Sequence, residues 1–393
     1  MIRTFTKNHI ILSLKMIVCT FLIFNVTGCW SRQEVDSISI VMGIGLDIAE
    51  NSEQVRFTAQ VFKPVEQKEG GREGGGGEVS FWNVESSGET VSSAVQSALH
   101  EAPRELYFSH NQIVIFGQNL AKNGILPHMD FFVREHSNRL TIQVLVAKNQ
   151  AGEILATPAH LEKMPALDMR DLIEAQTEVS QSGTVNLKQI MTRLMSTTTA
   201  PIAPLIEVSE QGSEQTVRLS GTAVFKKDKL VGELDQRETR GMLWVLGEVR
   251  RGVIEVACPE SGGKVALITI LSKPKVVPVE EHGKVKIIID VKEEGILGSQ
   301  SCPENFSSPE KNKQLEEMKA DAIHQEIRKA ITKAQELNAD IFGFGDAVHR
   351  KYPKLWKQLE QDWDTIFPDM EIDLAVETIV RNEGRASEPL TEE

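Results

Sequence analysis

The 393-residue sequence lacks the short motifs that identify most enzyme active sites. It contains no HExxH zinc motif, no GxSxG nucleophile elbow, no CxxC pair, no Walker A loop and no dinucleotide-binding GxGxxG. Its nine histidines are scattered, and no two have the spacing of metal ligands on one face of a helix. We therefore expect a protein that is not an enzyme and that binds neither a metal ion nor an organic cofactor.

Positive charge is also scarce. The chain has 43 lysines and arginines against 56 acidic residues, which gives a net charge of −13. Nucleic-acid binding needs clustered cations to neutralise phosphates, so this composition excludes DNA and RNA as expected partners. The same deficit argues against adhesion to anionic lipid by charge alone.

Long apolar runs are absent after the first 28 residues, and the run within them is short. Residues 16–26 (MIVCTFLIFNV) are almost purely apolar and follow three cations, Arg3, Lys7 and Lys15. A permanent membrane-spanning helix needs about 20 apolar residues. A basic start followed by a shorter apolar run instead predicts an export signal at residues 1–28.

The end of this signal resembles a bacterial lipobox. Val26, Thr27 and Gly28 lead directly into Cys29. A lipobox implies cleavage between Gly28 and Cys29 and a covalent diacylglycerol on the cysteine, which anchors the chain to the outer face of a membrane. Ordinary secretion with an incidental cysteine is the alternative. We favour the anchor because Cys29 stands at the cleavage point of an otherwise complete signal.

Cysteine is rare, with four in the whole chain. Cys19 leaves with the signal and Cys29 takes the lipid, so Cys258 and Cys302 remain. Outside the cytoplasm these two could form a disulfide. Sequence alone does not tell whether they lie close enough, and we favour two buried free thiols over a disulfide.

Strand-like and helix-like segments alternate along the rest of the chain. This pattern predicts an α+β (mixed α/β) fold of three linked domains, each with a β-sheet and packed helices. The expected parts are an N-terminal mixed α/β domain at 29–150, a helical middle region at 151–205, a C-terminal β-rich domain at 206–385 and a disordered tail at 386–393.

Glycines crowd residues 69–78 (EGGREGGGGE), between two strand-like segments. A phosphate-binding P-loop would need Gly-Lys-Ser/Thr at the start of a helix, and a strand follows here. The segment therefore predicts a flexible hairpin tip.

The C-terminal region contains a predicted long helix at 309–338. Ser308 suits its N-cap and Pro309 its first position. Beyond it, Trp356 and Trp363 are two helical turns apart and would share a face of an unbroken helix, with Phe367 following. We favour packing of these aromatics against the long helix; a docking face for a partner protein is the alternative.

A second candidate contact is the pair Asp130 and Arg134, which stand at i, i+4 on a predicted helix. We favour a structural role for this pair over contact with a partner.

Four blocks of the chain together resemble the Ger(x)C family, the lipoprotein C subunits of spore germinant receptors. They include GCWSRQEVDSISIVMGIGLD around the lipid cysteine and LSGTAVFKKDKLVGELDQRETRG. The other two contain FGQNLAKNGILPHMDFFVREHSNR and NADIFGFGD. The four blocks begin at residues 28, 116, 219 and 334, and they follow the family order.

This resemblance implies a non-enzymatic subunit that acts in nutrient-triggered germination of a Gram-positive spore former. It implies three linked mixed α/β domains and a place on the outer face of the plasma membrane, which in the spore is the inner membrane. Its implied partners are membrane A and B subunits. A solute-binding lipoprotein of a membrane transporter is the alternative, although the β-rich stretch 206–291 fits poorly with two lobes around a cleft.

Overall fold

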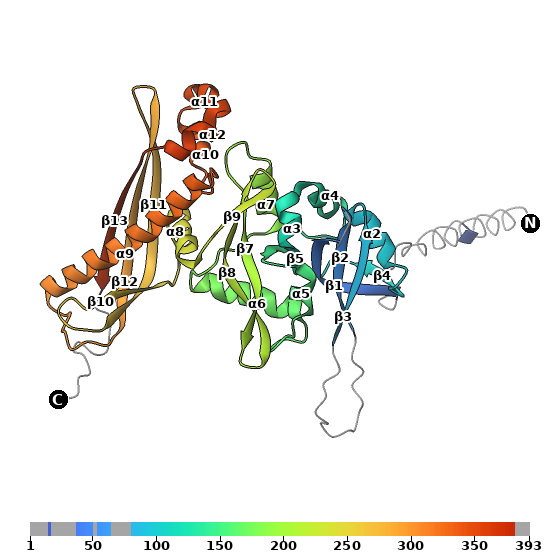
Figure 1. The fold of residues 1–393 in the computed structure, drawn as a ribbon. Helices are drawn as coiled ribbons and strands as arrows, with labels where there is room; N and C mark the ends of the chain where they lie inside the picture. The colour runs from blue at the N-terminus through green and yellow to red at the C-terminus, as the bar shows by residue number, and fades with distance from the viewer. Residues whose placement is uncertain (1–14, 17–36, 50–52, 64–79, 382–393) are drawn as a thin grey trace, which may run out of the picture. The chain divides into compact units, whose positions relative to one another are not determined.

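The computed structural model describes residues 15–16, 37–49, 53–63 and 80–381 (Figure 1). Cys29, with the rest of the predicted lipobox, lies outside these residues, as do the hairpin tip 69–78 and the tail 386–393. The chain divides into one unit at Met1–Ile38 and another at Ser39–Glu393. The account below concerns the second.

The first sheet is mixed and has the strand order β3-β2-β1-β5-β6-β7-β8-β9, with β4 paired to β1. Strands β1, β5, β6 and β7 are parallel, and both ends of the sheet are antiparallel hairpins. Its strands are β1 (Ile38–Ile48), β2 (Val55–Phe62), β3 (Phe81–Gly88), β4 (Glu105–Tyr107), β5 (Ile113–Phe116), β6 (Gln143–Ala147), β7 (Ile202–Gln211), β8 (Glu214–Lys226) and β9 (Lys229–Leu234).

Helices cover both faces of this sheet, which explains the continuous apolar run of its central strands. On β5, Val114 belongs to one hydrophobic cluster and Ile115 to the other, since alternate side chains point to opposite faces. The helices are α2 (Val91–Ala98), α3 (Gln118–Asn123), α4 (Leu126–Arg134), α5 (Ala151–Ala156), α6 (Pro165–Glu178) and α7 (Leu187–Leu194).

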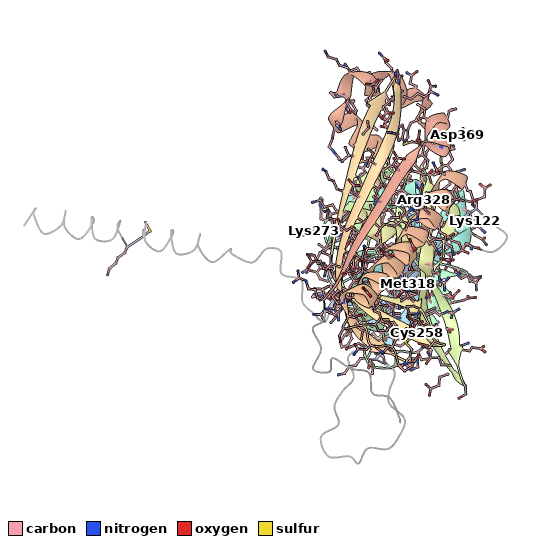
Figure 2. The ribbon with its side chains drawn as sticks, turned by 90° about the vertical axis from the view of Figure 1, so that its left-hand side faces the viewer. Lys122, Cys258, Lys273, Met318, Arg328 and Asp369 are labelled. Atoms are coloured by element: carbon pink, nitrogen blue, oxygen red, sulfur yellow. A yellow bond between two sulfur atoms is a disulfide. The ribbon has the colours of Figure 1, made fainter. Side chains whose placement is uncertain are left out.

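The second sheet has the order β10-β11-β12-β13, and β13 runs parallel to β12. Helix α9 packs along it, and Arg328 of α9 donates to the carbonyl of Ile372 at 2.8 Å (Figure 2). The elements are α8 (Gln236–Leu246), β10 (Val253–Ala257), β11 (Lys264–Glu281), β12 (Lys284–Gln300), α9 (Pro309–Glu336), α10 (Phe344–Lys351), α11 (Pro353–Leu359), η2 (Glu360–Asp362), α12 (Trp363–Ile366), η3 (Phe367–Asp369) and β13 (Ile372–Arg381).

The mixed α+β class expected from the sequence is confirmed, and α9 begins where its capping residues predict. Ser308 Oγ accepts a hydrogen bond from Lys311 N, and Pro309 is the first helical residue.

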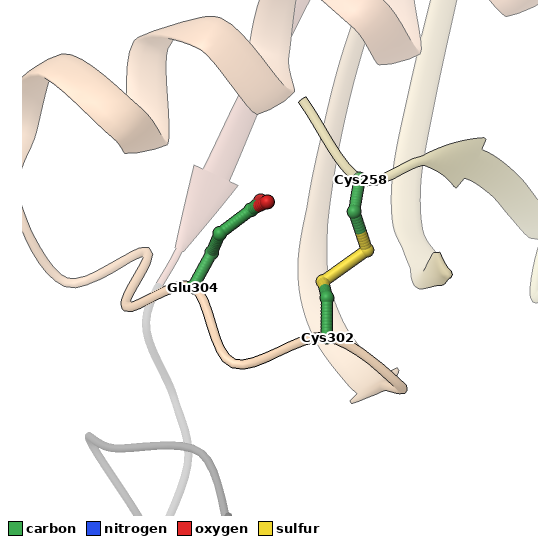
Figure 3. A group of neighbouring side chains, drawn as sticks. All are labelled: Cys258, Cys302 and Glu304. Carbon is green, nitrogen blue, oxygen red and sulfur yellow. A yellow bond between two sulfur atoms is a disulfide. The ribbon is translucent and has the colours of Figure 1, made fainter. Parts of the chain in front are cut away.

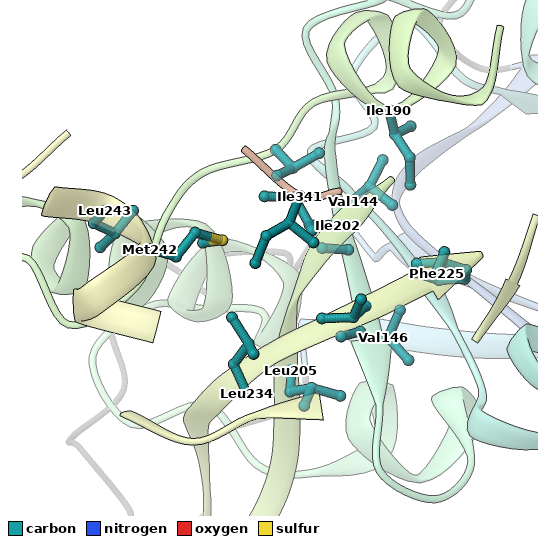
Figure 4. Packing of buried hydrophobic residues seen from close by; sticks show 14 of the residues in the cluster. Val144, Val146, Ile190, Ile202, Leu205, Phe225, Leu234, Met242, Leu243 and Ile341 are labelled. Atoms are coloured by element: carbon teal, nitrogen blue, oxygen red, sulfur yellow. The ribbon is translucent and has the colours of Figure 1, made fainter. Parts of the chain in front are cut away.

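The domain boundary expected at residue 206 is wrong as a division between sheets. Residue 206 lies inside β7, and β7 pairs with β6 through Val146–Leu205 and Ala147–Ile206. The first sheet therefore continues to β9, and α5 to α7 pack on it. One hydrophobic core joins residues from β6 to β9 with Met242 and Leu243 of α8 and with Ile341 (Figure 4). The change of sheet falls between β9 and β10.

Candidate functional site

Asp340 lies between α9 and α10 and is only 3% exposed. Its carboxylate accepts hydrogen bonds from the backbone N–H groups of Gly343, Phe344 and Gly345 at 2.8–3.0 Å. Gly343 adopts a positive φ of 76°, which glycine reaches without strain. Burial raises the pKa of Asp340 to about 6, although the three N–H donors act to lower it.

Arg193, at the end of α7, ties this turn to the first sheet. Its Nη1 donates to the carbonyl of Ala200 and to that of Ile341, both at 2.9 Å. Burial lowers the pKa of Arg193, and the carboxyls of Glu248, Asp340 and Asp346 act to raise it. Because an arginine keeps its charge in proteins, Asp340 and Asp346 of the turn face a fixed cation.

Asp346 makes a second link between the same two segments. Its two carboxylate oxygens accept from the hydroxyls of Thr198 and Thr199 at 2.6 and 2.7 Å. These hydrogen bonds join the loop after α7 to the first turn of α10. Hydrogen bonds to a charged acceptor are roughly twice as strong as those between neutral groups. These two hydrogen bonds therefore hold the segments together more strongly than two neutral ones would.

Lys226, at the end of β8, makes the third link. Its Nζ donates to the carbonyl of Asn338 at 2.6 Å and to Asp364 at 2.8 Å, while Asn338 Nδ2 donates to the carbonyl of Asp364. We call the whole cluster the polar junction; it consists of Arg193, Thr198, Thr199, Lys226, Asn338, Asp340, Asp346 and Asp364.

All members of the polar junction except Asp346 line a cavity of about 70 Å³, together with Trp363 and Phe367. Pockets for drug-sized ligands measure roughly 300–1,000 Å³, whereas one water occupies about 30 Å³ of liquid. The cavity therefore has room for water but not for a nutrient molecule. The arrangement holds two distant parts of the chain together by charged hydrogen bonds.

The three C-terminal aromatics that the sequence singled out lie together beside this cavity. Trp356 and Trp363 meet edge to face with ring centroids 5.2 Å apart, and Phe367 lies 6.4 Å beyond Trp363. The exposed fractions are 2%, 3% and 1%, so the expectation of core packing is confirmed.

The route by which these rings become buried differs from the one expected. The 3₁₀ turn η2 interrupts the helix, and the indoles meet across α11 and α12 rather than on one continuous face. His349 of α10 stacks on Trp356, and Gly345 of α10 lies against Trp363. Helix α9 contacts the end of this cluster, where Gln335 donates to the carbonyl of Phe367.

The other two predicted pairs lie apart from the polar junction. Arg134 donates to Asp130 at 2.7 Å on α4, and both side chains are more than half exposed. The hydrogen bond that Arg134 donates to Asp130 raises the pKa of Arg134. An exposed pair of this kind adds little to stability, and contact with a partner stays the untested alternative to a structural role.

Cys258 and Cys302 form a disulfide, so the expectation of two free thiols is wrong (Figure 3). Their Cα atoms are 6.4 Å apart. Strands β10 and β12 both run antiparallel to β11, so their C-terminal ends lie at the same end of the sheet. Cys258 follows β10, and Cys302 follows β12. Glu304 lies beside the bridge, but sulfurs bonded to each other offer no thiolate to a metal ion.

Sequence reasoning missed Asp340 as a site residue, although its segment NADIFGFGD belongs to one of the four family blocks. An aspartate three residues before a glycine can accept backbone N–H groups of its own turn, and this local signal was available. The partners from α7 and β8 had no such signal. Arg193 is 148 residues from Ile341, and Lys226 is 138 residues from Asp364.

Comparison with known proteins gives two family matches that together cover most of the chain. A family described as "Spore germination protein N-terminal domain" matches residues 31–208. A second family, "Spore germination B3/ GerAC like, C-terminal", matches residues 220–384. The latter range contains the whole second sheet and the Asp340 side of the polar junction.

Curated relatives come from Bacillus subtilis (strain 168). Spore germination protein KC is 27% identical over 92% of this chain and 94% of its own length. Spore germination protein B3 is 26% identical over 94% of this chain and 98% of its own length. Among solved structures, that of the GerBC protein superposes with a TM-score of 0.57 at 20% identity, covering 86% of this chain and 97% of GerBC. The likeness to GerBC shows a shared fold.

Proposed function

Because the chain belongs to the Ger(x)C family of spore germination proteins, we propose that it is the lipoprotein C subunit of a germinant receptor. In this role it acts with membrane A and B subunits in nutrient-triggered germination. The observation that carries the proposal is the match of both family models, in order, along nearly the whole mature chain.

The proposed anchor is a diacylglycerol on Cys29, which holds the chain on the outer face of the spore's inner membrane. The lipobox at residues 26–29 supports it. None of the helices in the described parts of the chain is both long and apolar enough to cross a bilayer. Two acyl chains bind a bilayer durably, since each buried methylene contributes about 0.8 kcal/mol.

We propose that the subunit is a scaffold and not an enzyme. Support comes from the polar junction, where Lys226 bonds to Asp364, Asp346 accepts from threonine hydroxyls, and Arg193 and Lys226 donate to backbone carbonyls. Its small cavity fits this role better than it fits recognition of a nutrient.

Co-purification tests the proposal. The C-terminally tagged, lipidated chain is extracted from spore membranes in mild detergent, and its partners are identified by mass spectrometry. We expect the A and B subunits with the wild type and a loss of both with Cys29→Ala. Recovery of an ATPase and a permease instead would favour the transporter alternative.

A further inference from the structure

Three aromatic side chains lie at one end of the first sheet, where the β2–β3 hairpin leaves it. Phe62 is 37% and Trp82 is 40% exposed, and Phe81 is partly exposed. By contrast, Trp244, Trp356 and Trp363 are at most 3% exposed. We call Phe62, Phe81 and Trp82 the aromatic edge.

Strand register places the aromatic edge on both faces of the sheet. Val61 pairs with Trp82, and Phe62 pairs with Phe81. Neighbouring residues of a strand point to opposite faces, so Trp82 lies on one face and the two phenylalanines on the other. Apolar rings therefore flank this corner of the sheet from both sides.

The aromatic edge is close to the start of the sheet along the chain. Val41 of β1 pairs with Val61, which in turn pairs with Trp82. With strands about 4.8 Å apart, the Trp82 backbone lies about 10 Å from Val41. Val41 is twelve residues after Cys29, and twelve residues span at most about 43 Å. A lipid on Cys29 thus keeps the aromatic edge within reach of the bilayer.

Charge and chemistry favour lipid as the occupant of this surface. The chain carries a net charge of −13, so it gains nothing from electrostatic attraction to anionic headgroups. Indole and phenyl rings partition to the membrane interface, where an apolar ring meets lipid and the indole N–H meets water. An apolar contact is the interaction that this acidic protein can offer to a bilayer.

We propose that the aromatic edge inserts into the interfacial layer of the membrane and so fixes the orientation of the anchored subunit. The proposal rests on the lipid anchor proposed above for Cys29. It adds a second contact, made by the folded domain itself, to a tether that would otherwise leave the domain free to rotate.

Fluorescence quenching tests the insertion. The whole chain after Cys29 carries an N-terminal histidine tag in place of the lipidated cysteine, and it is bound to phosphatidylcholine vesicles that contain a nickel-chelating lipid. The acyl chains carry bromine, which quenches tryptophan at the interface. Trp30 is next to the tag, so it is first replaced by phenylalanine. In this Trp30→Phe background, we expect clear quenching of the tryptophan fluorescence, and the quenching should fall at least several-fold when Trp82→Phe is added.

Two further variants separate insertion from general effects. Replacing Phe62 and Phe81 by serine should weaken the quenching of Trp82. Leu126→Ser is the matched control, because Leu126 is an apolar residue that is 53% exposed and is not part of the aromatic edge. It lies on α4, next to Ile125, whose N–H donates to the carbonyl of Asp228 in the β8–β9 turn. It should leave quenching unchanged. All these side chains are at least partly exposed, and unchanged melting will show that folding is intact.

Equal quenching with and without Trp82 would overturn the insertion, as would shielding of Trp82 that depends on added A and B subunits instead of lipid. The anchor is tested separately by flotation of the full-length protein from cells. The tag supplies the tether in the vesicle experiment, so a failed anchor and a failed aromatic edge give different results.

Discussion

The ammonium group of Lys319 lies 2.6 Å from Glu293 Oε1, and neither side chain is exposed to solvent. The pair joins α9 to β12 inside the core of the second sheet. Burial lowers the pKa of Lys319 and raises the pKa of Glu293, while their mutual attraction opposes both shifts. Gly295 leaves room for the ammonium, because a Cβ at this position would lie 2.1 Å from Lys319 Nζ.

Lys319→Met should destabilise the protein by about 3–5 kcal/mol, because it leaves the carboxyl of Glu293 buried without its partner. The double variant Lys319→Met, Glu293→Leu removes both charges and should recover most of that loss. Urea denaturation of the two variants and the wild type provides the measurement. Equal losses in the single and double variants would show that the pair is not coupled.

Asp340→Asn should change how stability depends on pH. In the folded protein Asp340 keeps its proton up to about pH 6, whereas in the unfolded chain it releases it near 3.8. The unfolded state therefore binds fewer protons between these values, and the free energy of unfolding falls as pH rises through them. The contribution of Asp340 to this fall is about 3 kcal/mol, and Asp340→Asn should abolish it.

Denaturation at intervals from pH 4 to pH 7 measures this contribution as the difference between the wild type and Asp340→Asn. Asp362→Asn, at an exposed position in η2, serves as the control and should keep the wild-type slope. A constant difference between wild type and Asp340→Asn across the range would contradict the prediction.

Trp363→Ala should lower the stability of the isolated chain by about 3–5 kcal/mol, because it removes a buried indole and leaves a cavity. Trp82→Ala is the matched control, since the same substitution at a 40% exposed position should cost much less. Thermal melting of both variants gives the comparison. If Trp363→Ala melts like the wild type, the indole is not part of the core.

Removing the disulfide by Cys258→Ser and Cys302→Ser should cost about 4 kcal/mol in the chain-entropy account, because the bridge closes a loop of 44 residues. Reduction of the wild type should cause a similar loss, which denaturation with and without reductant can measure. An unchanged midpoint under reductant, with the thiols shown to be free, would count against a stabilising bridge.

Cys29→Ala should leave the chain without lipid and its signal uncut or miscut. Germination should weaken, because an unanchored subunit loses the high local concentration that the tether provides near its partners. Mass spectrometry of the N-terminus and a germination assay are the two readouts. A cleaved, membrane-bound and fully active variant would refute the anchor.

Much of the fold could be predicted because its signals are local. The start of α9 follows from the capping chemistry of Ser308 and Pro309, and the apolar runs of β5 and β6 follow from burial on both faces. The candidate site was only partly predictable. Trp356 and Trp363 were correctly expected in the core, but the break at η2 that brings their rings together had no sequence signal that we identified.

The sequence by itself determined the kind of elements, the predicted lipid attachment at Cys29 and the resemblance to spore germination proteins, because each depends on residues close together in the chain. Only the tertiary structure decided that β7 continues the first sheet, that Cys258 meets Cys302, and that Arg193 reaches Ile341. These contacts join residues 44 to 148 positions apart. Their formation depends on how sheets and helices pack in space, which no local spacing of residues encodes.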